Sequence, residues 1–255
     1  MSTQPARMLS RSHRDSLVLL LAWAAGSVDA IGFLGLGHVF TANMTGNTVL
    51  LGLSLGEGRS LAALANVIAL AGFSLGVALG ALIVERDGNK GEWDRRVTSA
   101  LFLEALMLAA FTFFWHLTPG GAERTSAALY TLIALSAAAM GIQSAAVRRL
   151  NLPGVATTYV TGTMTSLLAG LTARLHSARP AAAKNPPPPE SQPASKHTAL
   201  QAGVIVIYGF SALASGFFQI HVPSLVAVTP LFAISVVLLA VGFAHRGHEQ
   251  VASSK

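Results

Sequence analysis

The chain of 255 residues contains no cysteine and very little charge. Without cysteine there are no disulfides, no thiol catalysis and no iron–sulfur clusters. Charged residues make up 11% of the chain, against about a quarter in an average soluble domain. These charges occupy a few blocks between long, nearly uncharged stretches. A soluble helical core would need helices with a charged face, which these stretches lack.

Catalytic signatures are absent as well. The sequence has no G-x-x-x-x-G-K-[ST], G-x-S-x-G or H-E-x-x-H motif. Asp29 and Glu104 are the only carboxylates within the long apolar stretches, and the histidines lack metal-ligand spacing. We therefore expect no enzyme activity, no cofactor and no bound metal. Cytoplasmic loops rich in Lys and Arg account for the net charge of +6, so we expect no nucleic-acid partner.

Long apolar stretches are what the sequence does have. Six of them reach roughly 19 to 24 residues, enough to cross about 30 Å of hydrocarbon at 1.5 Å per residue. The expected spans are 16–36, 61–84, 97–117, 125–147, 199–220 and 225–244. The fold class predicted is an all-α polytopic membrane protein in a lipid bilayer.

A short polar signature occurs twice between these spans. It reads TANMTGNT at 41–48 and TTYVTGTM at 157–164, and a short apolar run follows each copy. Polar backbone at membrane depth is tolerated only where it is buried in protein or lines a cavity. We expect two re-entrant half-helix segments, at about 37–56 and about 150–174, in addition to the six spans.

The distribution of Lys and Arg separates two topologies. If both short segments re-enter, only Arg59 and Arg124 of the 17 Lys and Arg residues lie outside, and 15 lie inside. If both segments span, 11 lie inside and 6 outside. The positive-inside rule favours six spans with both termini in the cytoplasm.

With six spans, the two copies of the signature enter the membrane from opposite sides. The halves 16–117 and 125–244 are then an inverted 3+3 repeat, an architecture that recurs in transporters. At an offset of 116, Thr41 aligns with Thr157, and at an offset of 115, Gly26 aligns with Gly141. Outside the halves we expect cytoplasmic tails at 1–15 and 245–255, and within the second half a Pro-rich cytoplasmic linker at about 176–198.

The polar residues of the two signatures are the candidate site. Helix N-termini at the membrane centre favour an anion or a polar solute. The candidate solute-binding residues are Asp29, Asn43, Thr45, Gly46, Asn47, Gln143, Thr161, Gly162 and Thr163. We expect Thr45 or Asn47 to cap the first half-helix and Thr161 the second. In the alternative interpretation each signature only caps its own helix, and Asp29 binds the broken backbone.

Two further features of the spans have simpler interpretations. Glu104 is expected near the cytoplasmic interface, where Arg95, Arg96 or water would satisfy it. Gly72, Gly76 and Gly80 form a small-xxx-small pattern typical of close helix packing, within the chain or in a homo-oligomer.

The residues around both signatures resemble a known family. The segments GSVDAIGF at 26–33 and VFTANMTGN at 39–47, followed by Gln143, Arg148-Arg149 and TGT at 161–163, are similar to the YoaK-like family of bacterial membrane proteins. The resemblance extends over about residues 15–244 and implies a bacterial inner-membrane protein of about six helices. It implies no substrate or activity, because the family is a domain of unknown function.

The sequence therefore predicts an inner-membrane transporter or channel for a small polar or anionic solute, with its site between two inverted halves. The alternative is a membrane scaffold or regulatory protein that acts through its cytoplasmic loops.

Overall fold

The structure, a computed structural model, describes residues 9–85, 93–118, 124–177 and 197–253. Within these ranges every regular element is a helix, in agreement with the all-α prediction. The helices are α1 Arg11–Gly35, α2 Met44–Gly56, α3 Ser60–Val84, α4 Arg95–Leu117, α5 Ser126–Arg149, α6 Val160–Ser177, α7 Thr198–His221, α8 Pro223–Val226 and α9 Val228–Ser253.

The six predicted spans are confirmed by helix length and composition. The helices apolar and long enough to cross a membrane are α1, α3, α4, α5, α7 and the stretch Pro223–Ala244, which includes α8 and the start of α9. The helix α2 has 13 residues, or about 20 Å, which is short of a bilayer. The helix α6 has 18 residues and ends at Ser177, slightly beyond the re-entrant segment expected at about 150–174.

The two expected tails are partly helical, and the expected linker lies mostly outside the described ranges. The helix α1 begins at Arg11, inside the expected tail 1–15, and α9 continues to Ser253 through the expected tail 245–255. Most of the Pro-rich linker at 176–198 lies outside the described residues.

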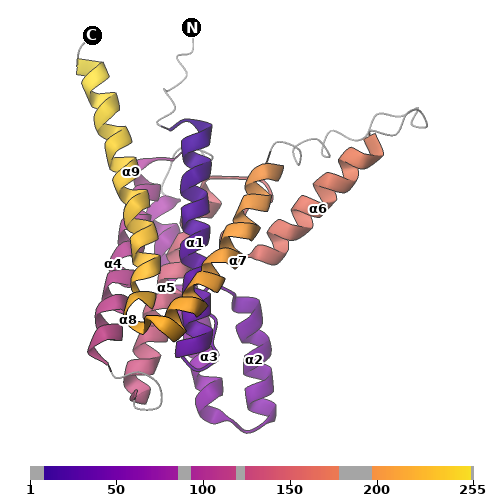
Figure 1. The fold of residues 1–255 in the computed structure, drawn as a ribbon, viewed down its shortest axis with the longest axis vertical. Helices are drawn as coiled ribbons and strands as arrows, with labels where there is room; N and C mark the ends of the chain where they lie inside the picture. The colour runs from indigo at the N-terminus through magenta and orange to yellow at the C-terminus, as the bar shows by residue number, and fades with distance from the viewer. Residues whose placement is uncertain (1–8, 86–92, 119–123, 178–196, 254–255) are drawn as a thin grey trace.

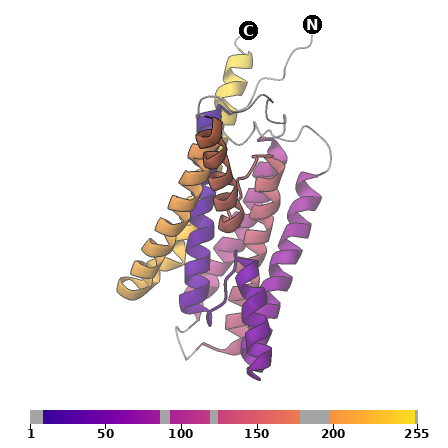
Figure 2. The same ribbon diagram turned by 90° about the vertical axis from the view of Figure 1, so that its right-hand side faces the viewer.

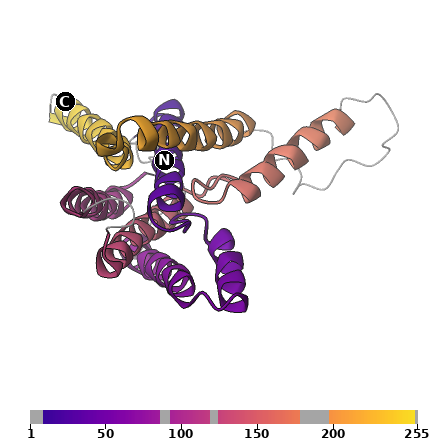
Figure 3. The ribbon, with the colours of Figure 1, turned by 60° about the horizontal axis from the view of Figure 1, so that its bottom comes forward.

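The short helices α2 and α6 lie on the same flank of the bundle but at opposite ends of it (Figures 1, 2 and 3). The helix α1 starts at the end of the bundle where α9 finishes and runs toward the other end (Figure 1). The chain then turns back, α2 starts part-way along the bundle, and α2 runs beside α3 (Figure 1). After α5 the chain turns back again, and α6 rises toward the opposite end (Figure 1).

The helix contacts place α1 and α5 at the centre. The first packs against α7 and α9, and the second packs against α3 and α4. The most apolar windows of α1 and α5 are each 67% buried, against 17–39% for the other four spans. Each short helix packs on one neighbour, α2 on α3 and α6 on α7. The remaining spans therefore surround a two-helix axis.

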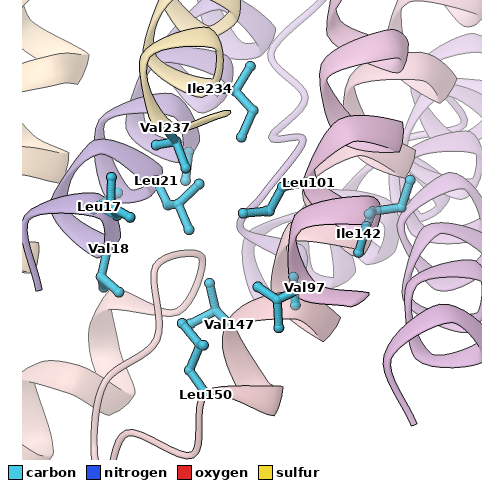
Figure 4. Packing of buried hydrophobic residues seen from close by; sticks show 14 of the residues in the cluster. Leu17, Val18, Leu21, Val97, Leu101, Ile142, Val147, Leu150, Ile234 and Val237 are labelled. Atoms are coloured by element: carbon cyan, nitrogen blue, oxygen red, sulfur yellow. The ribbon is translucent and has the colours of Figure 1, made fainter. Parts of the chain in front are cut away.

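Buried apolar side chains from separate spans meet along this axis (Figure 4). Leu21 of α1, Leu101 of α4, Ile142 of α5 and Ile234 of α9 belong to one cluster and are at most 1% exposed. Because lipid is itself apolar, such contacts hold membrane helices together through close packing, without a hydrophobic gain between helices.

The glycines of α3 face α5. A Cβ at Gly76 would overlap the carbonyl oxygen of Ala138, and a Cβ at Gly80 would lie 2.8 Å from the Cβ of Ala145. At Gly72 the nearest atom would be the Ala134 oxygen, at 3.1 Å. The three glycines thus lie at the closest approach of two helices of the same chain.

Candidate functional site

The first polar signature forms a corner between α1 and α2. The helix α1 ends at Gly35, and the carbonyl of that residue accepts a hydrogen bond from the Arg124 guanidinium at 3.1 Å. Gly37 and His38 then adopt left-handed conformations, with φ of 80° and 63°. This turn brings residues 39–43 back along the side of α1, toward Asp29.

The carboxylate of Asp29 binds the backbone of this corner. Its Oδ1 accepts hydrogen bonds from three successive amides, those of Thr41 at 2.8 Å, Ala42 at 2.6 Å and Asn43 at 3.3 Å. Its Oδ2 accepts a hydrogen bond from the Tyr208 hydroxyl of α7. Asp29 is 4% exposed, so protein donors bind both oxygens of a buried carboxylate.

Asn47, in the first turn of α2, binds the backbone of this corner. Its Oδ1 accepts from the Phe40 amide at 2.9 Å, and its Nδ2 donates to the Phe40 carbonyl at 2.5 Å. The expected cap at Thr45 or Asn47 is wrong, because α2 begins earlier, at Met44. Its N-cap is Asn43, whose side chain accepts from the Gly46 amide at 3.4 Å.

The second signature forms a corner between α5 and α6. The chain turns through Asn151 and Gly154, which have φ of 47° and 67°. The Gln143 amide donates to the Thr157 hydroxyl at 2.8 Å, and the hydroxyls of Ser144 and Thr158 lie 2.6 Å apart. The α5 side chains that bond Thr157 and Thr158 are therefore neutral, whereas a carboxylate binds the loop in the first corner.

Thr163 closes the second corner. Its hydroxyl accepts from the Ala156 amide and donates to the Ala156 carbonyl, both at 3.1 Å. The expected cap at Thr161 is wrong, because α6 already begins at Val160 and Thr161 lies within its first turn. Thr161 is exposed, as is Thr45 in α2.

The two glycines of the signatures make room for aromatic rings. A Cβ at Gly46 would lie 2.8 Å from the ring of Phe40, and one at Gly162 would overlap the ring of Tyr159. Both glycines therefore lie beneath an aromatic side chain from the preceding loop.

The candidate residues form two corners, not one central cluster. Asp29, Asn43 and Asn47 bind the loop at the start of α2. At the start of α6, Gln143 binds Thr157 and Thr163 binds Ala156. The Gln143 amide also donates to the carbonyl of Leu21 at 3.0 Å. Leu21 precedes Asp29 by eight residues, or about 12 Å along α1. The corners are therefore at different depths along the central pair of helices.

A cavity of about 360 Å³ opens beside the second corner. Its lining residues are Ser144, Val147, Arg148, Asn151, Leu152, Val155, Ala156, Thr157 and Thr158. The neighbouring Arg149 is buried and pairs with Asp94 at 3.8 Å, which ties the end of α5 to the start of α4. The lining is mixed: Val147, Leu152 and Val155 are apolar, while hydroxyls, Asn151 and Arg148 add polar and cationic groups.

Sequence reasoning missed Tyr208 and misplaced Glu104. Tyr208 is an aromatic residue within an apolar span, and only the fold brings it to Asp29. Glu104 is fully buried, and neither carboxyl oxygen has a hydrogen-bond partner in the described part of the chain, so Arg95 and Arg96 do not satisfy it. Among the described residues, no group of three His, Cys, Asp or Glu side chains could hold a metal ion.

Comparison with known proteins identifies the family. The model of the family described as "Protein of unknown function (DUF1275)" matches residues 17–243. The chain belongs to this family. It is also 41% identical over 171 residues to the UPF0700 transmembrane protein YoaK of Bacillus subtilis (strain 168), over 66% of this chain and 72% of that protein. No solved structure matches. The expected relationship to YoaK-like membrane proteins is confirmed, and with six apolar helices the chain is a multi-pass membrane protein.

Proposed function

We propose that this chain is a transporter or channel for a small polar or anionic solute, built from two inverted halves with α2 and α6 as re-entrant half-helices. The observation that carries the proposal is the matching hydrogen bonding of the two corners. Asn47 binds both backbone groups of the residue seven positions earlier, and Thr163, 116 residues further on, does the same.

The contacts between helix and loop support the same repeat. Thr41 donates to the Val28 carbonyl at 3.2 Å, and Gln143 contacts Thr157. The helix residues of these two contacts, Val28 and Gln143, are 115 positions apart, and the loop residues, Thr41 and Thr157, are 116 positions apart. The next residue along each helix, Asp29 or Ser144, contacts the next loop residue, Ala42 or Thr158. The two corners thus share two successive contacts between helix and loop in the same register.

Helix packing supports an inverted relation. A Cβ at Gly26 of α1 would overlap the carbonyl of Tyr208 in α7, and a Cβ at Gly141 of α5 would overlap the carbonyl of Phe73 in α3. The helices α1 and α5 run in opposite directions along the bundle (Figure 1). Duplicated, broken elements of this kind surround the solute site in many transporters.

We assign the end that carries the start of α1 and the end of α5 to the cytoplasm of a bacterial inner membrane. Arg11, Arg14, Arg95, Arg148 and Arg149 lie in the helix ends on this side, as the positive-inside rule requires. On this assignment the Arg59 loop between α2 and α3 faces outward.

Cysteine accessibility tests the topology, and the cysteine-free chain makes the background clean. Single substitutions Glu57→Cys and Ser177→Cys would be treated in intact cells with an impermeant thiol reagent. We expect Glu57→Cys to react in intact cells and Ser177→Cys to react only after permeabilisation. Reaction of both from the same side would contradict the inverted arrangement.

A second cysteine experiment tests for a solute pathway without knowledge of the solute. The substitution Thr158→Cys places a thiol in the cavity of the second corner. In a transporter or channel it reacts with a small impermeant reagent applied from outside, whereas Ser99→Cys, exposed at the start of α4, does not. If Thr158→Cys reacts only from the cytoplasmic side, a scaffold or regulatory protein becomes the better description.

A further inference from the structure

The second corner lacks the acceptor that completes the first. In the first corner, the three successive amides of residues 41–43 donate to one oxygen of Asp29. In the second, the corresponding amides are those of residues 157–159. Within the described ranges these three amides have no hydrogen-bond acceptor. Backbone N–H groups at membrane depth are costly to leave unpaired.

Neutral residues stand where the first corner has its carboxylate and phenol. Ser144 takes the place of Asp29, since each contacts the second residue of its loop. Phe73 takes the place of Tyr208, since their carbonyls lie against the equivalent glycines Gly141 and Gly26. The second corner thus presents the amides without a carboxylate of its own.

The cavity beside the second corner is lined by residues of the loop whose amides are unpaired. The cavity of about 360 Å³ is lined by Ser144, Thr157 and Thr158, and Arg148 adds a cation. The start of α6 adds the partial positive charge of a helix N-terminus. The cavity therefore brings together unpaired amides, hydroxyls and positive charge.

We propose that the second corner binds the carboxylate of a small solute in the position that the Asp29 carboxylate occupies in the first corner. One oxygen of the solute accepts from the amides of residues 157–159. The other accepts from Arg148 and from whichever of the Ser144 and Thr158 hydroxyls accepts the hydrogen bond between them, as Oδ2 of Asp29 accepts from Tyr208. This proposal rests on the inverted repeat described above and assigns a carboxylate as the substrate class.

A reporter thiol in the cavity wall measures occupancy directly. In the cysteine-free chain, purified in detergent at full length, Val155→Cys would be reacted with the uncharged reagent N-ethylmaleimide. We expect sodium acetate to slow this reaction relative to sodium chloride at equal ionic strength. A thiol at Thr165, exposed on α6 and outside the cavity lining, is the matched reporter that acetate leaves unchanged.

Substitutions then separate a built site from a general effect of acetate. Arg148→Gln removes a charge-assisted hydrogen bond and should weaken protection by roughly 10- to 100-fold. Ser144→Asp should abolish protection while the protein stays folded, because its carboxylate can take the amides as Asp29 does. Ser144→Asn adds similar volume without the charge and should retain protection.

Each outcome supports or overturns the assignment. Protection lost in Ser144→Asp but kept in Ser144→Asn supports it. Absence of protection in the Val155→Cys reporter, or equal protection in Ser144→Asp, overturns it, and equal protection by phosphate overturns the choice of a carboxylate. If acetate protects Val155→Cys but Thr158→Cys is never reached from outside, the binding site stands and the transport function fails.

Discussion

Asn47 and Thr163 perform the same task at equivalent positions of the two corners. Each side chain lies in the first helical turn and binds both the amide and the carbonyl of the residue seven positions earlier. A carboxamide does so with separate acceptor and donor atoms, whereas a hydroxyl oxygen serves as both. The geometry of the corner is therefore maintained although the residue type differs.

Removal of the Thr163 hydroxyl should destabilise the second corner. Thr163→Val keeps the shape but leaves both backbone groups of Ala156 without their partner. At about 1 to 3 kcal/mol for each unsatisfied buried group, we expect a loss of about 2 to 6 kcal/mol in unfolding free energy. Thr163→Ser retains the hydroxyl and should lose much less. Denaturation in mixed micelles measures both, and equal losses would contradict the assigned role of the hydroxyl.

Tyr208→Phe tests the link between the two halves. The substitution removes the donor to Asp29, a hydrogen bond to a carboxylate, which is worth about 1.5 to 3 kcal/mol. Tyr159→Phe is the control, because Tyr159 is 51% exposed and should tolerate the change. Unfolding free energies in detergent would distinguish them, and a Tyr208→Phe protein as stable as the parent would rule out an important bond.

The loss of folded protein caused by substitutions at Asp29 should increase with the number of acceptor oxygens removed. Asp29→Leu leaves three adjacent amides without an acceptor and should reduce the yield of folded protein severely. Asp29→Asn keeps one oxygen for these amides and should be milder. Size-exclusion profiles of the two purified variants would show the order, and the reverse order would contradict an anchoring role.

Thermal stability should depend steeply on side-chain size at Gly76, where α3 approaches α5 most closely. Gly76→Ala places a Cβ into the backbone of Ala138, so α3 has to move away from α5, at about 1 to 3 kcal/mol. Gly209→Ala in α7 meets nothing within 4 Å and should be neutral or stabilising, because alanine favours a helix. Thermal unfolding of the pair measures the difference. If the two variants have the same melting temperature, the close approach of α3 and α5 is wrong.

The buried carboxyl of Glu104 should be dispensable for folding. Both of its oxygens are buried without a partner in the described residues, and burying such a group opposes folding. We expect Glu104→Gln to be as stable as the parent and Glu104→Leu to be at least as stable. Loss of folded protein in Glu104→Leu would mean that the carboxyl has a structural partner.

The sequence predicts the spans better than the corners, for a physical reason. Span length and hydropathy are local properties, so the helices α3 and α4 match their predicted ranges within two residues at either end. The bond from Tyr208 to Asp29 joins residues 179 positions apart, and no local pattern indicates it. The expectation of an interfacial Glu104 follows from its position about two turns into the predicted span. Nine residues of helix nevertheless separate it from Arg95 and carry it about 14 Å along the span, into the core.

The bond between Tyr208 and Asp29 also sets an order of events during synthesis. Asp29 enters the membrane early, and its phenol partner is added 179 residues later, roughly 10 to 35 s at about 5 to 20 residues per second. Through that interval the first corner is incomplete, with one carboxylate oxygen still lacking its final donor. The first half of the nascent chain therefore remains without this hydrogen bond, or is shielded by the insertion machinery, until α7 is inserted.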